Sequence, residues 1–309
     1  MNADHATGVF LLMSVTASAT TQHGEWTLSH SQDPGTVAFA ITYSNSGGGH
    51  ASSSSDWSRN DFPGVDFSIA AKHDVRFSIN REAGTIDCDG FLKGGEGAGL
   101  FNFTSHPQFT SDMAALGFSD FTGEKLFAAT FHNVTAAFAK EMKAAGVTGL
   151  DADKLIAFRI FNVTPEFVRA LRAQGASANE ADKLIAFRIH GVTPDFIKSM
   201  RSKGGAVNDE DKLIAFRIHG VTPEFVDQMR SAGIGVQDSD KLIAFRIHGV
   251  SPEFVRTIEK AGFARPDPDQ LIALRIHGVT SNYIQTLRAR GIHNLTLDQV
   301  IALRIQGIN

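Results

Sequence analysis

Apolar and polar residues alternate with period two through the first third of the chain, which is the pattern of half-buried β-strands. Val75, Phe77 and Ile79 alternate with polar residues, and after a turn at 82–84 the chain returns over 85–92 in the same pattern. Strands are predicted over residues 25–28, 36–41, 75–80, 85–92 and 100–103. Short strands separated by turns favour an antiparallel sheet.

The segments between these strands carry weaker patterns. Residues 44–60 are rich in Ser and Gly, and we expect a long loop there. Gly94–Gly99 resembles part of a phosphate loop, but it precedes a strand rather than a helix, so a hairpin turn is predicted. Phe109, Met113 and Leu116 indicate a short helix or an extended exit from the sheet.

From residue 118 the pattern changes to a repeat of 29 residues. The unit is intact at 211–225, and its leucine anchor recurs at steps of 29 as Leu126, Leu155, Leu184, Leu213, Leu242, Leu271 and Val300. Each unit predicts two short helices. Because short helices are marginal alone, each pair must bury its apolar faces against neighbouring pairs, as in a solenoid.

Capping residues place the ends of both helices in each unit. Asp209 is typical of a helix N-cap, and Gly220 of the left-handed residue that follows a helix. Thr222 followed by proline opens the second helix. Asn133 and Asn162 stand in the glycine position of two early units, and Asn tolerates a positive φ better than most residues. Seven first helices and six second helices of about ten residues are predicted.

The fold class predicted is therefore α+β, an N-terminal antiparallel β domain followed by an α-solenoid of helix-pair repeats. We expect the β domain over residues 23–117 and about six and a half repeats over 118–309. Residues 1–22 hold either a cleavable leader or an N-terminal strand. Val9–Met13 is apolar and Ala17–Ala19 fits a cleavage site, but the start carries Asp4 and no basic residue.

One arginine recurs in six of the seven predicted first helices. Winding the helix at about 100° per residue places Arg217 about 40° and Ile218 about 140° from Leu213, so both are expected on the core face. A buried arginine needs an acceptor, here Glu166, Asp195, Glu224 or Glu253 or the carbonyls of the adjacent unit. Alternatively the row lines a groove that binds an anionic chain. These candidate binding residues are Arg159, Arg188, Arg217, Arg246, Arg275 and Arg304.

Five histidines also share one position, at the end of the first helix: His132, His190, His219, His248 and His277. Zinc ligands lie a little over 3 Å apart, whereas stacked helices are about 8–10 Å apart, so we expect helix-end histidines and no metal site. Cys88 shares a strand face with Ile86 and is expected to be a small core residue. Asp87 and Asp89 are expected to be solvated. We predict no catalytic residue and no cofactor.

The net charge of −4 is the sum of two parts of opposite charge. Residues 1–121 contain 5 Lys and Arg against 13 Asp and Glu, and residues 122–309 contain 24 against 20, so their charges are −8 and +4. The whole chain is not strongly basic, which disfavours nucleic acid as its partner. A single cysteine excludes an internal disulfide framework, and no apolar run is long enough to cross a membrane.

The units around 190–204 and 219–233 resemble Gly-Val-Thr-Pro-Glu-Phe repeats of bacterial proteins. Some of those are C-terminal extensions of beta-lactam-sensor-type membrane metallopeptidases. Segments 77–84 and 99–103 look like the region that precedes the repeats there, so the resemblance covers about residues 24–309. The chain lacks that family's His-Glu-x-x-His zinc motif and its membrane helices. The resemblance therefore implies a non-catalytic, extracytoplasmic module, with a cytoplasmic one as the alternative.

We accordingly expect a non-enzymatic binding or assembly protein that uses an extended helical-repeat surface. The opposite charges of the two halves favour head-to-tail self-association, and another protein is the other expected partner. The alternative is an extracytoplasmic sensor or ligand-binding module that holds an anionic polymer through the arginine row.

Overall fold

The computed structural model describes residues 19–44, 49–203, 209–235, 238–264 and 266–308. Residues 1–18, most of the segment expected to be either a leader or an N-terminal strand, lie outside this part. The chain divides into two compact units, a first unit of residues 1–144 with 150–160 and a second unit of residues 145–149 with 161–309. Each unit is described by itself.

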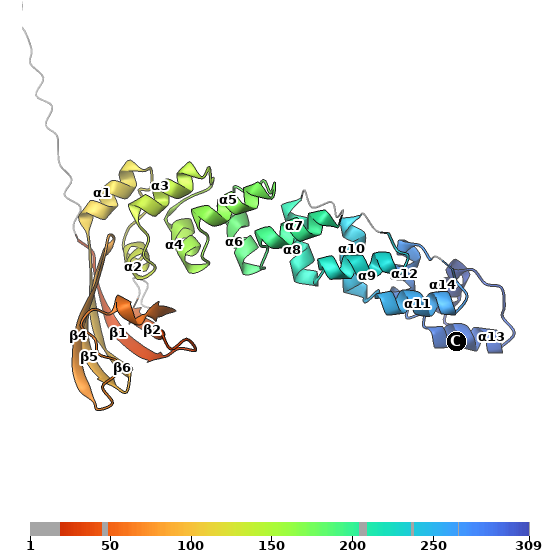
Figure 1. The fold of residues 1–309 in the computed structure, drawn as a ribbon, viewed down its shortest axis with the longest axis horizontal. Helices are drawn as coiled ribbons and strands as arrows, with labels where there is room; N and C mark the ends of the chain where they lie inside the picture. Colours follow the sequence, from red (N-terminus) through yellow and green to blue (C-terminus); the bar gives the residue numbers. More distant parts are fainter. Residues whose placement is uncertain (1–18, 45–48, 204–208, 236–237, 265, 309) are drawn as a thin grey trace, which may run out of the picture. The chain divides into compact units, whose positions relative to one another are not determined.

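The first unit is built on one six-stranded antiparallel sheet, which confirms the predicted β architecture. Its strands are β1 (Thr21–His30), β2 (Thr36–Ser44), β3 (His50–Ser58), β4 (His73–Arg81), β5 (Gly84–Lys93) and β6 (Glu96–Ser105). The order across the sheet is β3-β2-β1-β6-β5-β4. Two three-stranded meanders are thus joined where β1 pairs with β6 (Figure 1).

The long loop predicted for residues 44–60 is wrong, because β3 and a short 3₁₀ helix (Arg59–Asp61) occupy most of it. Every residue of β3 has a partner on β2, from Thr36 opposite Ser58 to Ser44 opposite His50. The backbone ladder therefore holds this serine-rich segment as an edge strand, where side chains need not be apolar.

The predicted turn at Gly94–Gly99 is shorter than expected. Gly94 and Gly95 form it with φ of +61° and +87°, whereas β6 already begins at the next residue. A Cβ on Gly99 would lie 2.7 Å from Nε1 of Trp26. This glycine is therefore in the strand to make room for the buried indole, which a turn prediction from composition does not consider.

The rest of the chain folds as the predicted helix pairs. The first helices are α2 (Glu124–Phe131), α4 (Ala152–Ile160), α6 (Ala181–Ile189), α8 (Glu210–His219), α10 (Ser239–His248), α12 (Pro268–Ile276) and α14 (Leu297–Ile305). The second helices are α3 (Ala136–Ala144), α5 (Pro165–Ala173), α7 (Pro194–Ser202), α9 (Pro223–Ser231), α11 (Pro252–Lys260) and α13 (Ser281–Ala289). Their caps are confirmed as well: Thr222 accepts a hydrogen bond from the Phe225 amide, and Gly220 and Asn133 have φ of +68° and +56°.

One further helix, α1 (Pro107–Ala115), belongs to the same repeat. Phe109 and Met113 stand 29 residues before Phe138 and Met142, and Gly117 stands 29 before Gly146. Since α1 packs against α3, it takes the place of a second helix that precedes the first complete pair. The short helix expected here is therefore the first helix of the array.

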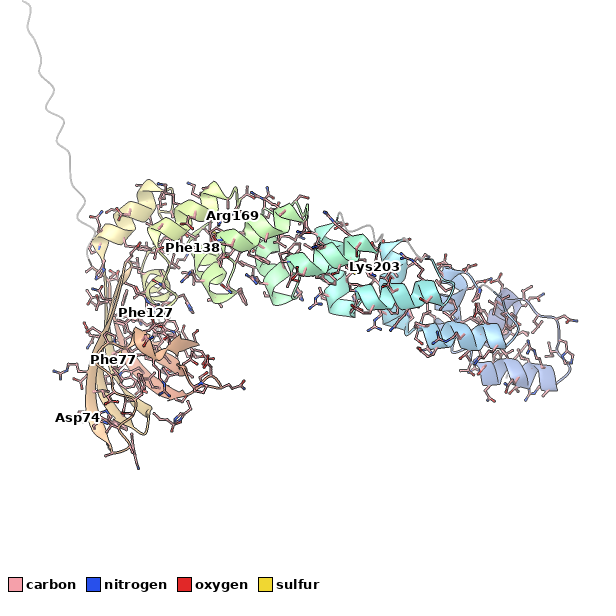
Figure 2. The ribbon with its side chains drawn as sticks, in the orientation of Figure 1. Asp74, Phe77, Phe127, Phe138, Arg169 and Lys203 are labelled. Carbon is pink, nitrogen blue, oxygen red and sulfur yellow. The ribbon has the colours of Figure 1, made fainter. Side chains whose placement is uncertain are left out.

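Helix α2 closes the core of the sheet. Phe127 on α2 stacks on Phe101 with ring centroids 5.3 Å apart and meets the edge of Tyr43 at 4.8 Å. One turn later, Phe131 stacks on Phe39 at 5.7 Å. Figure 2 shows Phe127 where α2 meets the sheet. The sheet face would expose these rings without α2, so sheet and first repeat share one core.

In the second unit, first and second helices form two rows (Figure 1). Consecutive first helices pack on each other from α6 to α14, and α5 packs on α7. Each pair buries equivalent side chains between the rows, such as Leu213 and Phe216 at 0% exposure and Met229 at 1%. The repeat thus builds a continuous core from units too small to fold alone.

Candidate interaction surface of the helical repeats

The first helices bury a narrower arc than the sequence suggested. Leu213 and Phe216 are buried, and their directions around the helix differ by only about 60°. Arg217 lies at the margin of this arc and is exposed, and Ile218 lies opposite it and is 55% exposed. The prediction that Arg217 and Ile218 face the core is therefore wrong, because the true centre of the arc lies between Leu213 and Phe216 rather than towards Ile214.

Each arginine of the row ties its repeat to the preceding one. Nε of Arg217 donates to the carbonyl of His190 at 3.3 Å, and its guanidinium lies 5.0 Å from the ring centroid of Phe196. The same carbonyl bond is made by Arg159 to His132 (3.1 Å), Arg246 to His219 (3.3 Å) and Arg275 to His248 (3.2 Å). All six arginines lie over the aromatic ring of the preceding second helix. The distance from the guanidinium carbon to the ring centroid is 5.3 Å for Arg159, 3.8 Å for Arg188 and 4.9 Å for Arg304.

These contacts decide which acceptor the arginines use. Arg159, Arg217, Arg246 and Arg275 bond to carbonyls, one of the two classes expected, whereas Nε of Arg188 is buried without a hydrogen-bond partner among the described residues. Glu166 pairs with Arg169 and Glu253 with Arg256 on their own helices. A carbonyl at a helix end is an otherwise unsatisfied acceptor, so the arginine caps the preceding helix and stacks on its neighbour at once. Burial lowers the pKa of Arg159 and Arg188.

A second row of cations runs along the second helices and was missed from the sequence. Arg172 donates to the Gly146 carbonyl at 3.3 Å and Arg201 to the Gly175 carbonyl at 2.8 Å. Arg230 bonds to Lys203, and Arg288 to Ala261, in the same way. The signal was available, since these arginines share the 29-residue step and only Glu259 interrupts it.

Lysine and aspartate connect the other ends of the first helices. In the second unit Lys183 pairs with Asp211, Lys212 with Asp240, and Lys241 with Asp269. In the last step Gln270 replaces lysine and donates to Asp298 at 3.1 Å. The aspartates of these pairs are largely exposed, so the pairs fix the register of neighbouring helices more than they stabilise the fold.

The outward side of the first helices carries a row of exposed isoleucines, which we call the isoleucine row. In the second unit its members are Ile189 (54% exposed), Ile218 (55%), Ile247 (55%), Ile276 (54%) and Ile305 (60%). Ile160 in the first unit occupies the same position and is 50% exposed. Because consecutive first helices pack side by side, the row in the second unit is one continuous apolar stripe.

His132, His190, His219 and His248 act through their backbone carbonyls, as acceptors for the arginine row. His132 is also affected by its surroundings, since burial and the charges of Arg81 and Arg159 lower its pKa to about 4. Over the described ranges, the trio close enough to share a metal ion is Asp120, Asp151 and Asp153, with no histidine among it. Asp120 accepts from the Ala152 amide at 3.1 Å and pairs with Lys125.

The β4–β5 turn clamps the first helix pair from the sheet side. Arg81 donates to the carbonyls of Thr130 and Phe131 at the end of α2, at 3.0 and 2.6 Å. Its guanidinium lies 4.1 Å from the ring centroid of Trp57, and burial lowers its pKa to about 10. The neighbouring Glu82 accepts from the Ala136 amide at the start of α3, where a carboxylate favours the helix dipole.

The candidate groups of the sheet lie as expected. Cys88 is 1% exposed, and burial raises the pKa of its thiol, so it is the predicted core residue and a poor nucleophile. Asp89 pairs with Arg76 at 2.6 Å, and Asp87 accepts from Ser78. Both carboxylates are on the outer face of the sheet.

No protein-family model, no curated protein and no solved structure matches this chain. Within the described ranges, no helix is long and apolar enough to cross a membrane.

Proposed function

We propose that this chain is a non-enzymatic binding or assembly protein whose isoleucine row docks a protein partner. The proposal rests on the row itself, which consists of five half-exposed isoleucines at one repeated position of the second unit. Burying such a half-exposed side chain contributes roughly 1 kcal/mol, so the row offers several kcal/mol to a partner that covers it. A contiguous exposed apolar stripe is typical of an interaction surface.

The charges beside the row define the chemistry of the partner. Arg217, Arg246 and Arg275 are exposed and make no ion pair with any described residue. The surface is therefore apolar with a cationic margin. Its best partner presents apolar side chains together with carboxylates, since unpaired like charges would oppose docking.

The chemistry-bearing side chains support a role without catalysis. The thiol of Cys88 is buried, and the carboxylates of Asp120 and Asp151 accept hydrogen bonds from the first turn of α4. All six arginines of the row lie over aromatic rings, and Arg159, Arg217, Arg246 and Arg275 also donate to carbonyls. Groups held in this way position helices rather than reactants. The resemblance of residues 190–204 to repeats of bacterial sensor-type proteins adds the proposal that the module is extracytoplasmic.

The second candidate, an anionic-polymer sensor, draws less support from the geometry. Each guanidinium of the row already has one face on an aromatic ring, and Nε of Arg217 is used by a carbonyl. Changing Arg217 and Arg246 to Gln would distinguish the candidates. A sensor predicts steeply salt-dependent binding that this change abolishes in a folded chain, whereas a structural row predicts a less stable array.

The proposed function is tested with a peptide library displayed on phage and panned against the intact chain. Counter-selection uses a variant with Ile218, Ile247 and Ile276 changed to Gln. We expect the retained peptides to combine apolar residues with Asp or Glu. A variant with the exposed Gln228 and Gln285 of the second helices changed to Ala should bind them like the unaltered chain. Peptides that bind the isoleucine variant equally well would contradict the proposal.

A further inference from the structure

We propose that the partner of the isoleucine row is the outer face of the β-sheet of a second copy of this chain. The inference rests on the proposed function, because it names the occupant of the same surface. It rests on a second exposed apolar feature, on the sheet, whose apolar side chains and acidic neighbours complement the apolar and cationic row.

The outer face of the sheet has an apolar centre. Leu100 on β6 is 64% exposed, and Phe91 on β5 is 37% exposed. Elsewhere on the described strands, large apolar side chains point to the buried face. Leu100 lies directly opposite Glu25 on one neighbouring strand and Asp89 on the other. An exposed leucine between two carboxylates is a mixed apolar and acidic patch, which is the chemistry that the isoleucine row requires.

A hollow of about 520 Å³ lies at this patch. It is lined by Leu100, Phe91 and Ala98 together with Trp26 and Gly99, which are paired on neighbouring strands. Gly90 and Gly99 face the buried side of the sheet, where a Cβ on either would lie 2.7 Å from the Trp26 indole, so the outer-face hollow is bounded by the side chains of Leu100 and Phe91 and their polar neighbours. An open apolar hollow rimmed by carboxylates can accept branched aliphatic side chains, and the row presents five of them on a regular spacing.

Charge supports the same pairing. Asp74 and Asp87 add to the acids on the outer face, which outnumber the cations there: Arg76 pairs with Asp89, and Lys72 lies 3.9 Å from the ring centroid of Phe91. The part of the chain that contains the sheet has a charge of −8 over residues 1–121, against +4 over residues 122–309. The cationic margin of the row and the acidic rim of the hollow attract each other, and two rows facing each other would not gain this attraction.

The contact joins two unlike surfaces, and each copy carries one of each. Such a heterologous contact builds an open chain unless the rotation between copies closes a ring. We therefore expect assemblies that grow with protein concentration and shorten as salt rises, because the attraction between exposed charges is screened.

The experiment uses two variants of the full chain in sedimentation velocity. The first changes Leu100 to Gln, and the second changes Ile218, Ile247 and Ile276 to Gln. Each variant alone should stay monomeric at concentrations where the unaltered chain assembles. An equimolar mixture should form complexes that stop growing, because only one intact hollow and one intact row are available to each pair. Thr42→Gln, on the same face but outside the hollow, should assemble like the unaltered chain.

Three results would overturn the inference. One is a monomeric unaltered chain at high concentration and low salt, which leaves the peptide-binding test of the row unaffected. Another is Leu100→Gln that assembles like the unaltered chain, since the row would then pair with something other than the hollow. The third is a mixture that stays monomeric while both variants show unaltered circular dichroism.

Discussion

At the scale of the residue, the helix-ending glycines have two separate reasons to lack a side chain. Gly220 has φ of +68°, and a Cβ there would also lie 2.9 Å from a terminal nitrogen of Arg246. Gly278 has φ of +65° with nothing within 4 Å of such a Cβ. The backbone requirement is common to both positions, whereas the arginine contact is present only at the first.

Gly220→Val should lower the free energy of unfolding by at least about 1–2 kcal/mol, because a β-branched residue resists positive φ. Gly278→Val should cost less, since it displaces no arginine. Gly220→Asn should cost least, as Asn133 and Asn162 adopt this conformation naturally. Urea denaturation of the three variants measures the order, and equal midpoints would contradict the assignment.

His132 gives the first unit a pH dependence. Its pKa in the folded chain is about 4, below its ordinary value of 6.5, because it is buried beside Arg81 and Arg159. The unfolded chain therefore binds this proton first as the pH falls. The stability that the neutral ring contributes is complete above pH 6.5 and is lost as the pH falls towards 4.

His132→Phe should flatten the decline of the urea midpoint between pH 6.5 and 4.5. Phenylalanine is a matched choice, because Phe161 occupies the same position in the next repeat. The readout is the fluorescence of Trp57, which lies 5.1 Å from Phe131. An unchanged slope in this variant would show that another group controls the pH dependence.

At the scale of the element, the first helix is apolar on two sides and buries only one. Leu213 and Ile218 are equally apolar in the sequence, yet one is 0% and the other 55% exposed. Periodicity alone could not tell which of the two is buried, since apolar residues point in a wide range of directions around this helix. Packing decides which side of the helix is buried, because Phe216 and the second helix cover the side that carries Leu213.

Leu213→Ala should cost about 2–5 kcal/mol, because it opens a cavity in the core. Ile218→Ala should change stability by less than about 0.5 kcal/mol, since its side chain is already half in water. Thermal unfolding followed by circular dichroism compares the two. A larger loss for Ile218→Ala would mean that the helix is rotated from the orientation described here.

At the scale of the whole molecule, the sheet and the start of the array are one cooperative structure. Phe127 and Phe131 fill the sheet core, and Arg81 and Glu82 hold the ends of α2 and α3. A domain boundary placed near residue 117 from composition separates residues that are in contact, because composition follows the change of secondary structure and not the packing between elements.

A fragment of residues 1–160 should therefore unfold in a single cooperative transition, whereas a fragment of residues 1–117 should not fold. The shorter fragment lacks α2 and leaves Phe39 and Phe101 without their stacking partners. Denaturation followed by tryptophan fluorescence gives the comparison. Cooperative unfolding of the shorter fragment would show that the sheet is independent of the array.

The sequence by itself determined the features that depend on neighbours along the chain. The 29-residue period, the Thr-Pro helix starts, the left-handed Gly and Asn helix ends and the alternating strands all follow from local backbone preferences. The same reasoning reached the candidate arginines but could not choose their acceptors, because carboxylates and carbonyls were both within plausible reach.

Only the tertiary structure decided what each side chain faces. It placed Ile218 in solvent, stacked Arg217 on Phe196, recruited α2 to the sheet and turned residues 50–58 into an edge strand. These outcomes depend on residues far apart in the chain, whose burial is set by the packing of neighbouring repeats and strands. The isoleucine row and the hollow at Leu100 emerge at this level, because exposure is a property of the assembled surface rather than of the residue type.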